Sequence, residues 1–594
     1  MFIWENSELN TEQADAVRLP GNVFLIACPG SGKTRTLTYK AAYELSRLNS
    51  EKQFVIAITY THRAAEEIQE RIENLGEDTS KLWIGTIHSF CLEWIIKPYA
   101  IYLPELAHGF RVIDLHEQEK LLEHLCAPYK AQKISPYDCE YFYTSDGYVL
   151  GCKATVKHTI LHLIMKQYFQ HLIKNRQLDF EQMLWYAYRL LNENPSINTL
   201  LSKMFSFILV DEYQDTKQLQ YAIIAGILRA GSTNIFVVGD PNQAIYGSLG
   251  GYAIPVQDFR TLTGLTIQEC ELSKNYRSSE RIVQYFGNFN SHGSNITSAS
   301  RDQEYQSIIS YNCNITRDAL VDELVRLIKH NIVVLGILPS EVCIVAPWWI
   351  HLATMTRSLV VRMPEYQFDG PGMVPFSRDF ENFWYKLSKI ALTEPSPGMY
   401  VRRIRWAAEI LGELDDVGIQ VPGLSSKRLL YECNSIQLDE TNGLIYLKEF
   451  FDAFFAALDI NFHDYPHLEE HYVAFFESSL ARIRKLEKEG ALAIGDISFF
   501  RKVFQSRIGI TVSTIHGVKG AEFDVVIAYG LLEGMVPHFS DVNGTASAEK
   551  LLYVIGSRAR KNLHLISETG RKNGWSIYGP TVRLSTCVFA YDKF

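Results

Sequence analysis

The sequence predicts an α/β protein with two parallel sheets, each interrupted by a mainly helical insertion. Short apolar runs alternate with helical patterns over residues 1–90, and strand-like runs return at 207–238 and again from about 305. Such alternation is typical of a parallel sheet with helices on both faces. A chain of 594 residues is also too long for a single core, so several domains are expected.

The first predicted sheet has strands at 23–27, 54–59, 83–87, 207–210 and 235–238, with helices at 34–48 and 64–74. Between its two parts lies a segment with helical periodicity at 115–125 and 157–174 and no strand pattern. We therefore expect a first sheet domain formed by 1–90 and 201–275, and a helical insertion at 91–200.

The second predicted sheet has strands at 307–311, 342–346, 510–514, 525–529 and 563–567. Residues 380–500 between them look helical, and the aromatic stretch 450–455 is expected to be helix core. We therefore expect a second sheet domain formed by 276–380 and 501–594, with a helical insertion at 381–500.

Two carboxylates, Asp211 and Glu212, directly follow the apolar run 207–210. Open α/β sheets bind ligands at the carboxyl ends of their strands. The pair is therefore expected to serve a magnesium-bound nucleotide.

A phosphate-binding loop follows the strand at 23–27. Its backbone N–H groups can wrap phosphate oxygens, Lys33 can reach the β- and γ-phosphates, and the Thr34 hydroxyl can ligate Mg²⁺. Ala27 stands where the general pattern has its first glycine. The residues expected to bind the nucleotide here are Ala27, Cys28, Pro29, Gly30, Ser31, Gly32, Lys33, Thr34 and Arg35.

Composition sets weaker limits. The net charge of −9 does not suggest nucleic-acid binding, although a local basic channel can coexist with an acidic exterior. Ten scattered cysteines without a Cys-x-x-Cys pair argue against zinc, an iron–sulfur cluster or a disulfide framework. No leader pattern and no apolar run of membrane-spanning length is evident, so a cytoplasmic protein without a membrane partner is expected.

Further motifs surround the acidic pair. They lie at 10–13, 57–68, 84–90, 238–247, 272–278, 514–523 and 553–559, and they include Asn275-Tyr276-Arg277-Ser278. In this order they resemble the motifs of superfamily 1A DNA helicases, the UvrD/Rep/PcrA group, over nearly the whole chain. The resemblance implies two RecA-like domains, ATP and Mg²⁺ as cofactors, and 3′→5′ movement on single-stranded or forked DNA.

The resemblance also implies roles for individual residues. Gln13 would read adenine and Tyr276 would stack on it, while Glu522 would lie near the sugar. Asp211 would help to hold the metal, and Glu212 would activate the attacking water. The γ-phosphate contacts would be Gln243, Arg277 and Arg558, with both arginines arriving from the second sheet domain as the cleft closes.

The resemblance also implies contacts with a DNA strand. Candidate contacts are Tyr60, Thr61, His88, Tyr246, Tyr252, Thr514 and His516. Ordinary packing of the tyrosines and a structural role for the histidines remain open. The family has an aromatic residue and an arginine where this chain has Ser248 and Leu249, so the grip on the strand is expected to be weaker.

Two functions follow. The first is an ATP-dependent DNA translocase and helicase in repair or anti-phage defence. The second is a DNA-sensing ATPase subunit that regulates a partner nuclease, because short strings at 84–86 and 95–99 resemble the helicase subunit of Gabija-like systems, which work with an OLD-family nuclease. A nuclease function for Asp592 near the end of the chain is disfavoured, since no acidic cluster precedes it.

Overall fold

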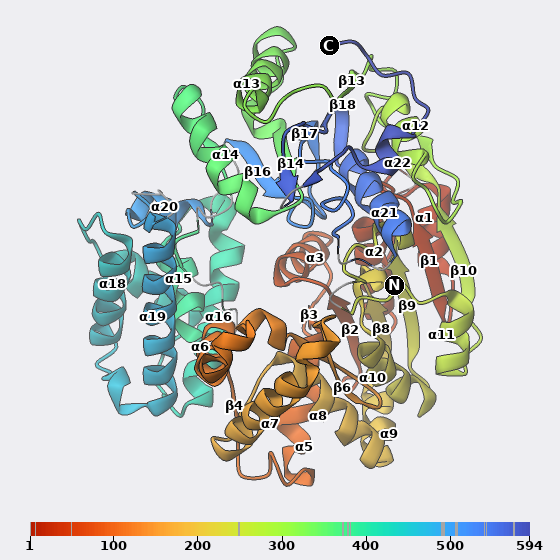
Figure 1. Cartoon of the computed structure of the whole chain (residues 1–594). Coiled ribbons are helices and arrows are strands. Elements are labelled where there is room, and N and C mark those ends of the chain that lie inside the picture. The colour runs from red at the N-terminus through yellow and green to blue at the C-terminus, as the bar shows by residue number, and fades with distance from the viewer. Residues whose placement is uncertain are drawn as a thin grey trace. The chain divides into compact units, whose positions relative to one another are not determined.

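The computed structural model describes residues 2–594, apart from 6, 49, 248–249, 371–373, 377–378, 380–381, 489–492, 505–508, 540, 542 and 574–575. The chain forms two compact units (Figure 1). The first contains 1–317 and 515–594, and the second contains 318–514. The fold is of the predicted α/β class, with the parallel strands of two RecA-like domains.

The first unit holds a six-stranded sheet in the order β10-β1-β9-β8-β2-β3. All five neighbouring pairs are parallel. The strands are β1 (Val23–Ala27), β2 (Phe54–Thr59), β3 (Leu82–Thr86), β8 (Phe205–Val210), β9 (Asn234–Gly239) and β10 (Gln268–Leu272). Five of these strands lie where the sequence predicts them, and β10 is additional.

Both faces of this sheet are buried, because successive side chains of a strand point to opposite sides. In β2, Val55 and Ala57 join one apolar cluster while Ile56 and Ile58 join the other. Helices α1 (Thr11–Arg18), α2 (Lys33–Leu45) and α3 (His62–Asn74) contribute to the first cluster, and α10 (Gln218–Arg229) and α11 (Val256–Thr263) to the second. Continuous apolar strands are the consequence of this double burial.

The segment 91–200 is mainly helical, with α6 (Leu115–Cys126), α7 (His158–Lys174), α8 (Phe180–Glu193) and α9 (Pro195–Met204). It also contains four short strands that the sequence did not reveal. β5 (Tyr141–Thr144) and β6 (Gly147–Leu150) form a hairpin, while β4 (Arg111–Val112) pairs with β7 (Gln177–Leu178). Strands of two to four residues are too short to show a reliable period of two.

The strands of the second RecA-like domain are distributed over both units. In the first unit, β13 (Ile309–Asn312), β18 (Ala559–Ile566) and β17 (Phe523–Ala528) pair in parallel in that order. In the second unit, β16 (Ile510–Thr514) pairs in parallel with β14 (Val342–Ala346) and with β15 (Phe368–Asp369). The predicted strands 342–346 and 510–514 coincide with β14 and β16, those at 307–311 and 525–529 are shifted by one or two residues, and β18 begins four residues before the predicted 563–567.

The end of the chain packs on β13. The Asp592 carboxylate binds Arg281 through two hydrogen bonds of 2.8 and 3.0 Å, and it accepts a third from the Ile309 backbone N–H at 2.7 Å. Asp592 therefore fastens the end of the chain to Arg281 and to β13.

The second unit contains a helical group with an aromatic core. Its main helices are α15 (Phe383–Ala391), α16 (Tyr400–Asp416), α17 (Ser426–Ser435), α18 (Gly443–Ala457) and α19 (Pro466–Lys488), drawn in teal to blue in Figure 1. Trp384 is fully buried and contacts the rings of Phe451 and Phe462. Phe450, Phe451, Phe454 and Phe455 are buried, as the sequence predicts for helix core.

Among the described residues, no helix is both long enough and apolar enough to cross a membrane.

Candidate nucleotide site and strand contacts

The phosphate-binding loop joins β1 to α2. Gly30 and Gly32 have φ values of +67° and +81°, which glycine adopts without strain. The Ser31 hydroxyl donates to the Cys28 carbonyl at 2.7 Å and so closes the turn. The Lys33 ammonium donates to the Ala27 carbonyl at 3.4 Å, while Thr34 and Arg35 occupy the first turn of α2. The loop therefore has the geometry that the sequence predicts, with backbone N–H groups at the start of a helix.

Burial raises the pKa of the Cys28 thiol to about 12. The Cys28 side chain is 3% exposed and stays protonated at neutral pH. This cysteine acts as a small apolar residue beneath the loop, because a thiolate is the reactive form.

The two carboxylates lie where β8 ends. The Asp211 backbone N–H still donates to Ile58 on β2 at 2.9 Å, whereas Glu212 has a φ of +50°. A non-glycine residue in this left-handed region costs of order 1–3 kcal/mol and marks functional sites more often than others. The turn at Glu212 directs the chain out of the sheet and into the short helix Tyr213–Asp215.

The electrostatic surroundings separate the two groups. Burial and the neighbouring Glu212 carboxylate raise the pKa of Asp211. Burial would also raise the pKa of Glu212, but Lys33, Lys519 and a hydrogen bond from Gln214 outweigh it, and the pKa is lowered. Glu212 is therefore ionised at neutral pH, as a group that orients water requires.

Asp211 and Thr34 can hold Mg²⁺. Among the residues that the structure describes, no group of three or more His, Cys, Asp or Glu side chains is arranged as a metal cage. Mg²⁺ at nucleotide sites commonly takes only one or two carboxylates and completes its shell with phosphate and water. A carboxylate whose charge is destabilised by burial and by a second carboxylate fits a cation, and Asp211 is such a group.

Gln243 follows β9 and lies at the centre of a buried polar network. Its Nε2 donates to the Asp240 carboxylate at 2.8 Å, and its Oε1 accepts from the Arg558 guanidinium at 2.6 Å. Gln214 connects this network to the acidic pair, because its Oε1 accepts from the Asp240 N–H at 3.0 Å while its Nε2 donates to Glu212. The side chains expected to sense the γ-phosphate are thus linked to the one expected to activate water.

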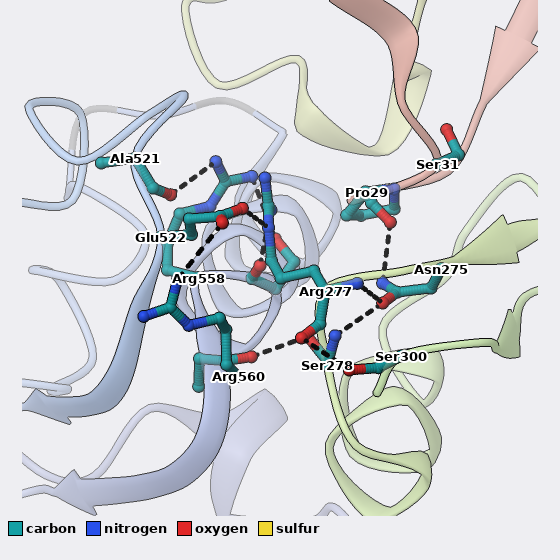
Figure 2. A network of polar contacts seen from close by, with 12 residues as sticks. Pro29, Ser31, Asn275, Arg277, Ser278, Ser300, Ala521, Glu522, Arg558 and Arg560 are labelled. Atoms are coloured by element: carbon teal, nitrogen blue, oxygen red, sulfur yellow. Dashed lines mark hydrogen bonds and ion pairs between the residues drawn. The ribbon is translucent and has the colours of Figure 1, made fainter. Parts of the chain in front are cut away.

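The two arginines come from different parts of the chain and lie in the same compact unit (Figure 2). Arg558 is 1% exposed and donates to Gln243 and to the carbonyl oxygens of Ala521 and Val554. Arg277 donates to the Glu522 carboxylate at 2.6 Å and to the Ser557 carbonyl at 2.9 Å. From the sequence we expected the two arginines to reach the γ-phosphate site only when a cleft closes. In this structure Arg558 is already hydrogen-bonded to Gln243.

Burial and the charge of Arg277 lower the pKa of Arg558 to about 9. The guanidinium is still protonated at neutral pH. Since two cations lie together in a buried place, an anionic ligand between them would relieve their repulsion.

Asn275 connects the phosphate-binding loop to the arginine and is a residue that the sequence did not single out. The Asn275 Nδ2 donates to the Pro29 carbonyl at 2.7 Å, and its Oδ1 accepts from the N–H groups of Arg277 and Ser278 (Figure 2). A Cβ on Gly30 would lie 2.5 Å from the Arg277 Cβ, so the two loops are in close contact. The only signal in the sequence is the position of Asn275 inside a recognised motif.

Gln13 and Tyr276 both contact the phosphate-binding loop. Gln13 is 4% exposed, and its Nε2 donates to the Ser31 carbonyl at 2.8 Å. Tyr276 is 43% exposed, and its backbone N–H donates to the Gly30 carbonyl at 2.9 Å. An exposed ring anchored to a buried loop is suited to stacking on a base.

The predicted strand contacts divide into two groups. Tyr60 and Tyr246 stack with their ring centroids 5.2 Å apart, and the Tyr246 hydroxyl donates to the His516 carbonyl at 3.3 Å. Tyr60 is 46% exposed, and Thr61 caps α3 by accepting from the Ala64 N–H. These four residues lie together in the first unit.

The remaining candidates have other surroundings. His88 packs edge-on against Phe180, and burial lowers its pKa to about 4, so it is neutral. The Tyr252 hydroxyl donates to Asp258 on α11 at 3.1 Å. Thr514 ends β16 in the second unit. Ser248 and Leu249, on which the expectation of a weaker grip depends, lie outside the described residues.

Lys519 joins the nucleotide network to the tyrosine pair. Its ammonium forms an ion pair with the Asp215 carboxylate, donates to the Gln243 carbonyl at 2.8 Å, and lies 5.1 Å from the centre of the Tyr246 ring. The Lys519 side chain is 8% exposed and that of Asp215 is fully buried. The sequence places both residues in motifs but gives no sign that the two meet.

Comparison with known proteins adds independent information. The UvrD/REP helicase N-terminal domain matches residues 9–259, and the UvrD-like helicase C-terminal domain matches 478–570. The two matches together cover more than half of the chain and include Lys33, Glu212 and Arg558, whereas Tyr276 and Arg277 lie between the matched ranges. This chain belongs to the UvrD/Rep family of superfamily 1 helicases.

Curated relatives agree with this family. The ATP-dependent DNA helicases PcrA of Staphylococcus epidermidis and Staphylococcus aureus are each 24% identical to this UvrD-like chain, over 95% of it and 84% of the relative. A probable DNA helicase II homolog of Mycoplasma capricolum is 29% identical over 47% of the chain and 40% of that relative. As a member of the family, the chain is an enzyme of the ATP-dependent DNA helicase class.

Proposed function

We propose that this UvrD-like chain hydrolyses ATP with Mg²⁺ to move 3′→5′ along single-stranded DNA and to separate forked duplexes, in DNA repair or anti-phage defence. The observation that carries the proposal is the continuous buried network from Glu212 through Gln214, Asp240 and Gln243 to Arg558. These groups are suited to placing water, phosphate and cations around one transferred phosphoryl group.

Catalysis by such a site rests on positioning and on charge, because the transferred phosphoryl group is loosely bound in the transition state. The Lys33 ammonium and the N–H groups of the loop bind the phosphates. Glu212 accepts a proton from the attacking water, and Arg277 and Arg558 stabilise the charge on the equatorial oxygens. Asp211 and Thr34 would hold Mg²⁺, which would offset the negative charge of the phosphates.

Coupling to DNA is proposed to run through Lys519. Its contacts with Asp215 and the Gln243 carbonyl place it at the nucleotide network, and its position over Tyr246 places it beside the exposed Tyr60 ring. A shift of Gln243 on hydrolysis would therefore be transmitted to the stacked tyrosines.

The test combines a variant with two DNA substrates. Single-stranded DNA should stimulate ATP hydrolysis, and Glu212→Gln should reduce kcat by at least about a hundredfold because the general base is lost. A fork with a 3′ single-stranded tail should be unwound faster than one with a 5′ tail. A rate of ATP hydrolysis that changes neither on adding DNA nor in Glu212→Gln would contradict the proposal.

A second candidate is a DNA-sensing ATPase subunit that regulates a partner nuclease of the OLD family and unwinds little by itself. It is favoured by Ser248 and Leu249, which replace the stacking aromatic and the arginine of the family. DNA-stimulated ATP hydrolysis without strand separation of either fork would support it. Robust unwinding by the isolated chain would exclude it.

A further inference from the structure

We infer that Asn10 is a positioning residue for nucleotide binding, which holds the Tyr276 ring in the orientation that a base requires. The inference rests on the proposed nucleotide site. The Asn10 Nδ2 donates to the Tyr276 hydroxyl oxygen at 2.7 Å, across 266 positions of sequence.

The orientation of the Asn10 amide is fixed by a second contact. Asn10 is the N-cap of α1, where its Oδ1 accepts from the Gln13 N–H at 2.8 Å. With the oxygen engaged in this way, the nitrogen is the atom that faces Tyr276. The amide thus performs two separable tasks: the oxygen caps the helix and the nitrogen binds the phenol.

Tyr276 is consequently held at both ends. Its backbone N–H is bound to Gly30 of the phosphate-binding loop, and its hydroxyl is bound to the start of α1. A ring that is 43% exposed would otherwise rotate in solvent. Restricting it before the ligand arrives lowers the entropic cost of stacking.

Gln13, which lies beside Asn10, can make the site selective for one base. Its Oε1 accepts from the Asn10 N–H at 3.0 Å and its Nε2 donates to Ser31. An amide oxygen has two lone pairs and an amide nitrogen two N–H groups, so one acceptor and one donor remain. That pair matches the N6 and N7 edge of adenine. Asn10 therefore positions both the stacking ring and the amide that faces the base.

The effect of losing this contact can be estimated. One neutral hydrogen bond contributes a factor of roughly 2 to 10 to an equilibrium. Removing the donor should therefore raise the KM for ATP by about two- to tenfold. The change should fall on KM rather than on kcat because the reacting groups are unaffected.

The experiment uses substitutions that separate the two tasks. Asn10→Ser keeps a good N-cap but cannot donate to Tyr276 in the same way. Tyr276→Phe keeps the ring and removes the hydroxyl. Asn10→Asp restores a contact with reversed polarity, since the phenol can donate to the carboxylate. Thr11→Ala, an exposed change in the same helix, is the matched control.

DNA-stimulated ATP hydrolysis of the full chain is measured for each variant, together with inhibition by inorganic tripolyphosphate, which has no base. The expected result is a raised KM for ATP in Asn10→Ser and Tyr276→Phe, no further rise in the double variant, recovery in Asn10→Asp, and unchanged tripolyphosphate inhibition. The inference would be overturned if the two substitutions multiplied in their effect on the KM for ATP, or if that KM were unchanged. It would also be overturned if the variants lost affinity for tripolyphosphate as much as for ATP. Absence of hydrolysis by the wild-type chain would instead contradict the proposed function.

Discussion

The Lys519–Asp215 ion pair allows a quantitative prediction for Lys519→Met. The substitution keeps the length of the side chain and removes the ammonium. Because the Asp215 side chain is fully buried, its carboxylate is left without a counter-charge. Removing one partner of a buried pair costs about 3–5 kcal/mol while the other stays charged, so the segment around Asp215 should lose up to that much local stability, and less where Asp215 takes up a proton.

Local stability is measured by hydrogen–deuterium exchange at the backbone N–H groups of Asp211, Asp215 and Thr216. Each of these donates to a carbonyl in the first unit. A loss of up to about 3–5 kcal/mol should accelerate their exchange by up to about two to four orders of magnitude.

The loss should also depend on pH. Burial raises the pKa of Asp215 from 3.8 to about 7 even with Lys519 present. For a carboxyl with a raised pKa, the folded state is favoured by protonation, so stability is highest below the ordinary pKa and falls as the pH rises through the folded one. Removing Lys519 raises the folded pKa further. The segment around Asp215 in the variant should therefore be less stable at pH 8 than at pH 6, after the exchange rates are corrected for their intrinsic pH dependence.

Two controls make the prediction refutable. Lys519→Met combined with Asp215→Asn removes both charges and should recover most of the lost protection. Arg362→Met breaks the exposed pair of Arg362 with Asp322 and should change stability by less than about 1 kcal/mol. Wild-type protection in Lys519→Met at pH 8, or no recovery in the double variant, would show that the ion pair does not hold this segment.

Three further predictions concern the site and the second unit. Arg558→Ala should lower kcat by about three orders of magnitude or more with little change in ATP binding. Single-turnover hydrolysis and nucleotide titration measure the two quantities. A kcat within tenfold of wild type would contradict the role proposed for this buried guanidinium. Tyr60→Leu should weaken binding of oligo-dT by about 1–3 kcal/mol in a fluorescence anisotropy titration. Tyr252→Phe, which removes only the contact with Asp258, should bind oligo-dT normally. Equal losses of oligo-dT affinity in the two variants would contradict a specific role for Tyr60. Phe451→Ala, at a fully buried ring in contact with Trp384, should cost about 3–5 kcal/mol and lower the thermal midpoint of the second unit; an unchanged midpoint would show that this core tolerates the cavity.

The positions of the main strands could be predicted because their signal is local. Val23–Ala27, Phe54–Thr59 and Val342–Ala346 are buried on both faces, and burial on both faces leaves a continuous apolar run in the sequence. The phosphate-binding loop was predictable for a similar reason, since Gly30, Gly32 and Lys33 lie within four successive positions. The short strands of 91–200 were not predicted because two to four residues carry too little periodicity.

The sequence by itself determined the α/β class, the order of the motifs and the residue types around a phosphate. Only the tertiary structure decided which of those residues meet. Asn10 reaches Tyr276, Lys519 reaches Asp215, and His88 is neutral in an apolar setting, although nothing near any of them in the sequence indicates it. The physical reason is that such contacts, and the pKa shifts that follow from burial, depend on segments that are far apart in the sequence and meet only when the chain folds.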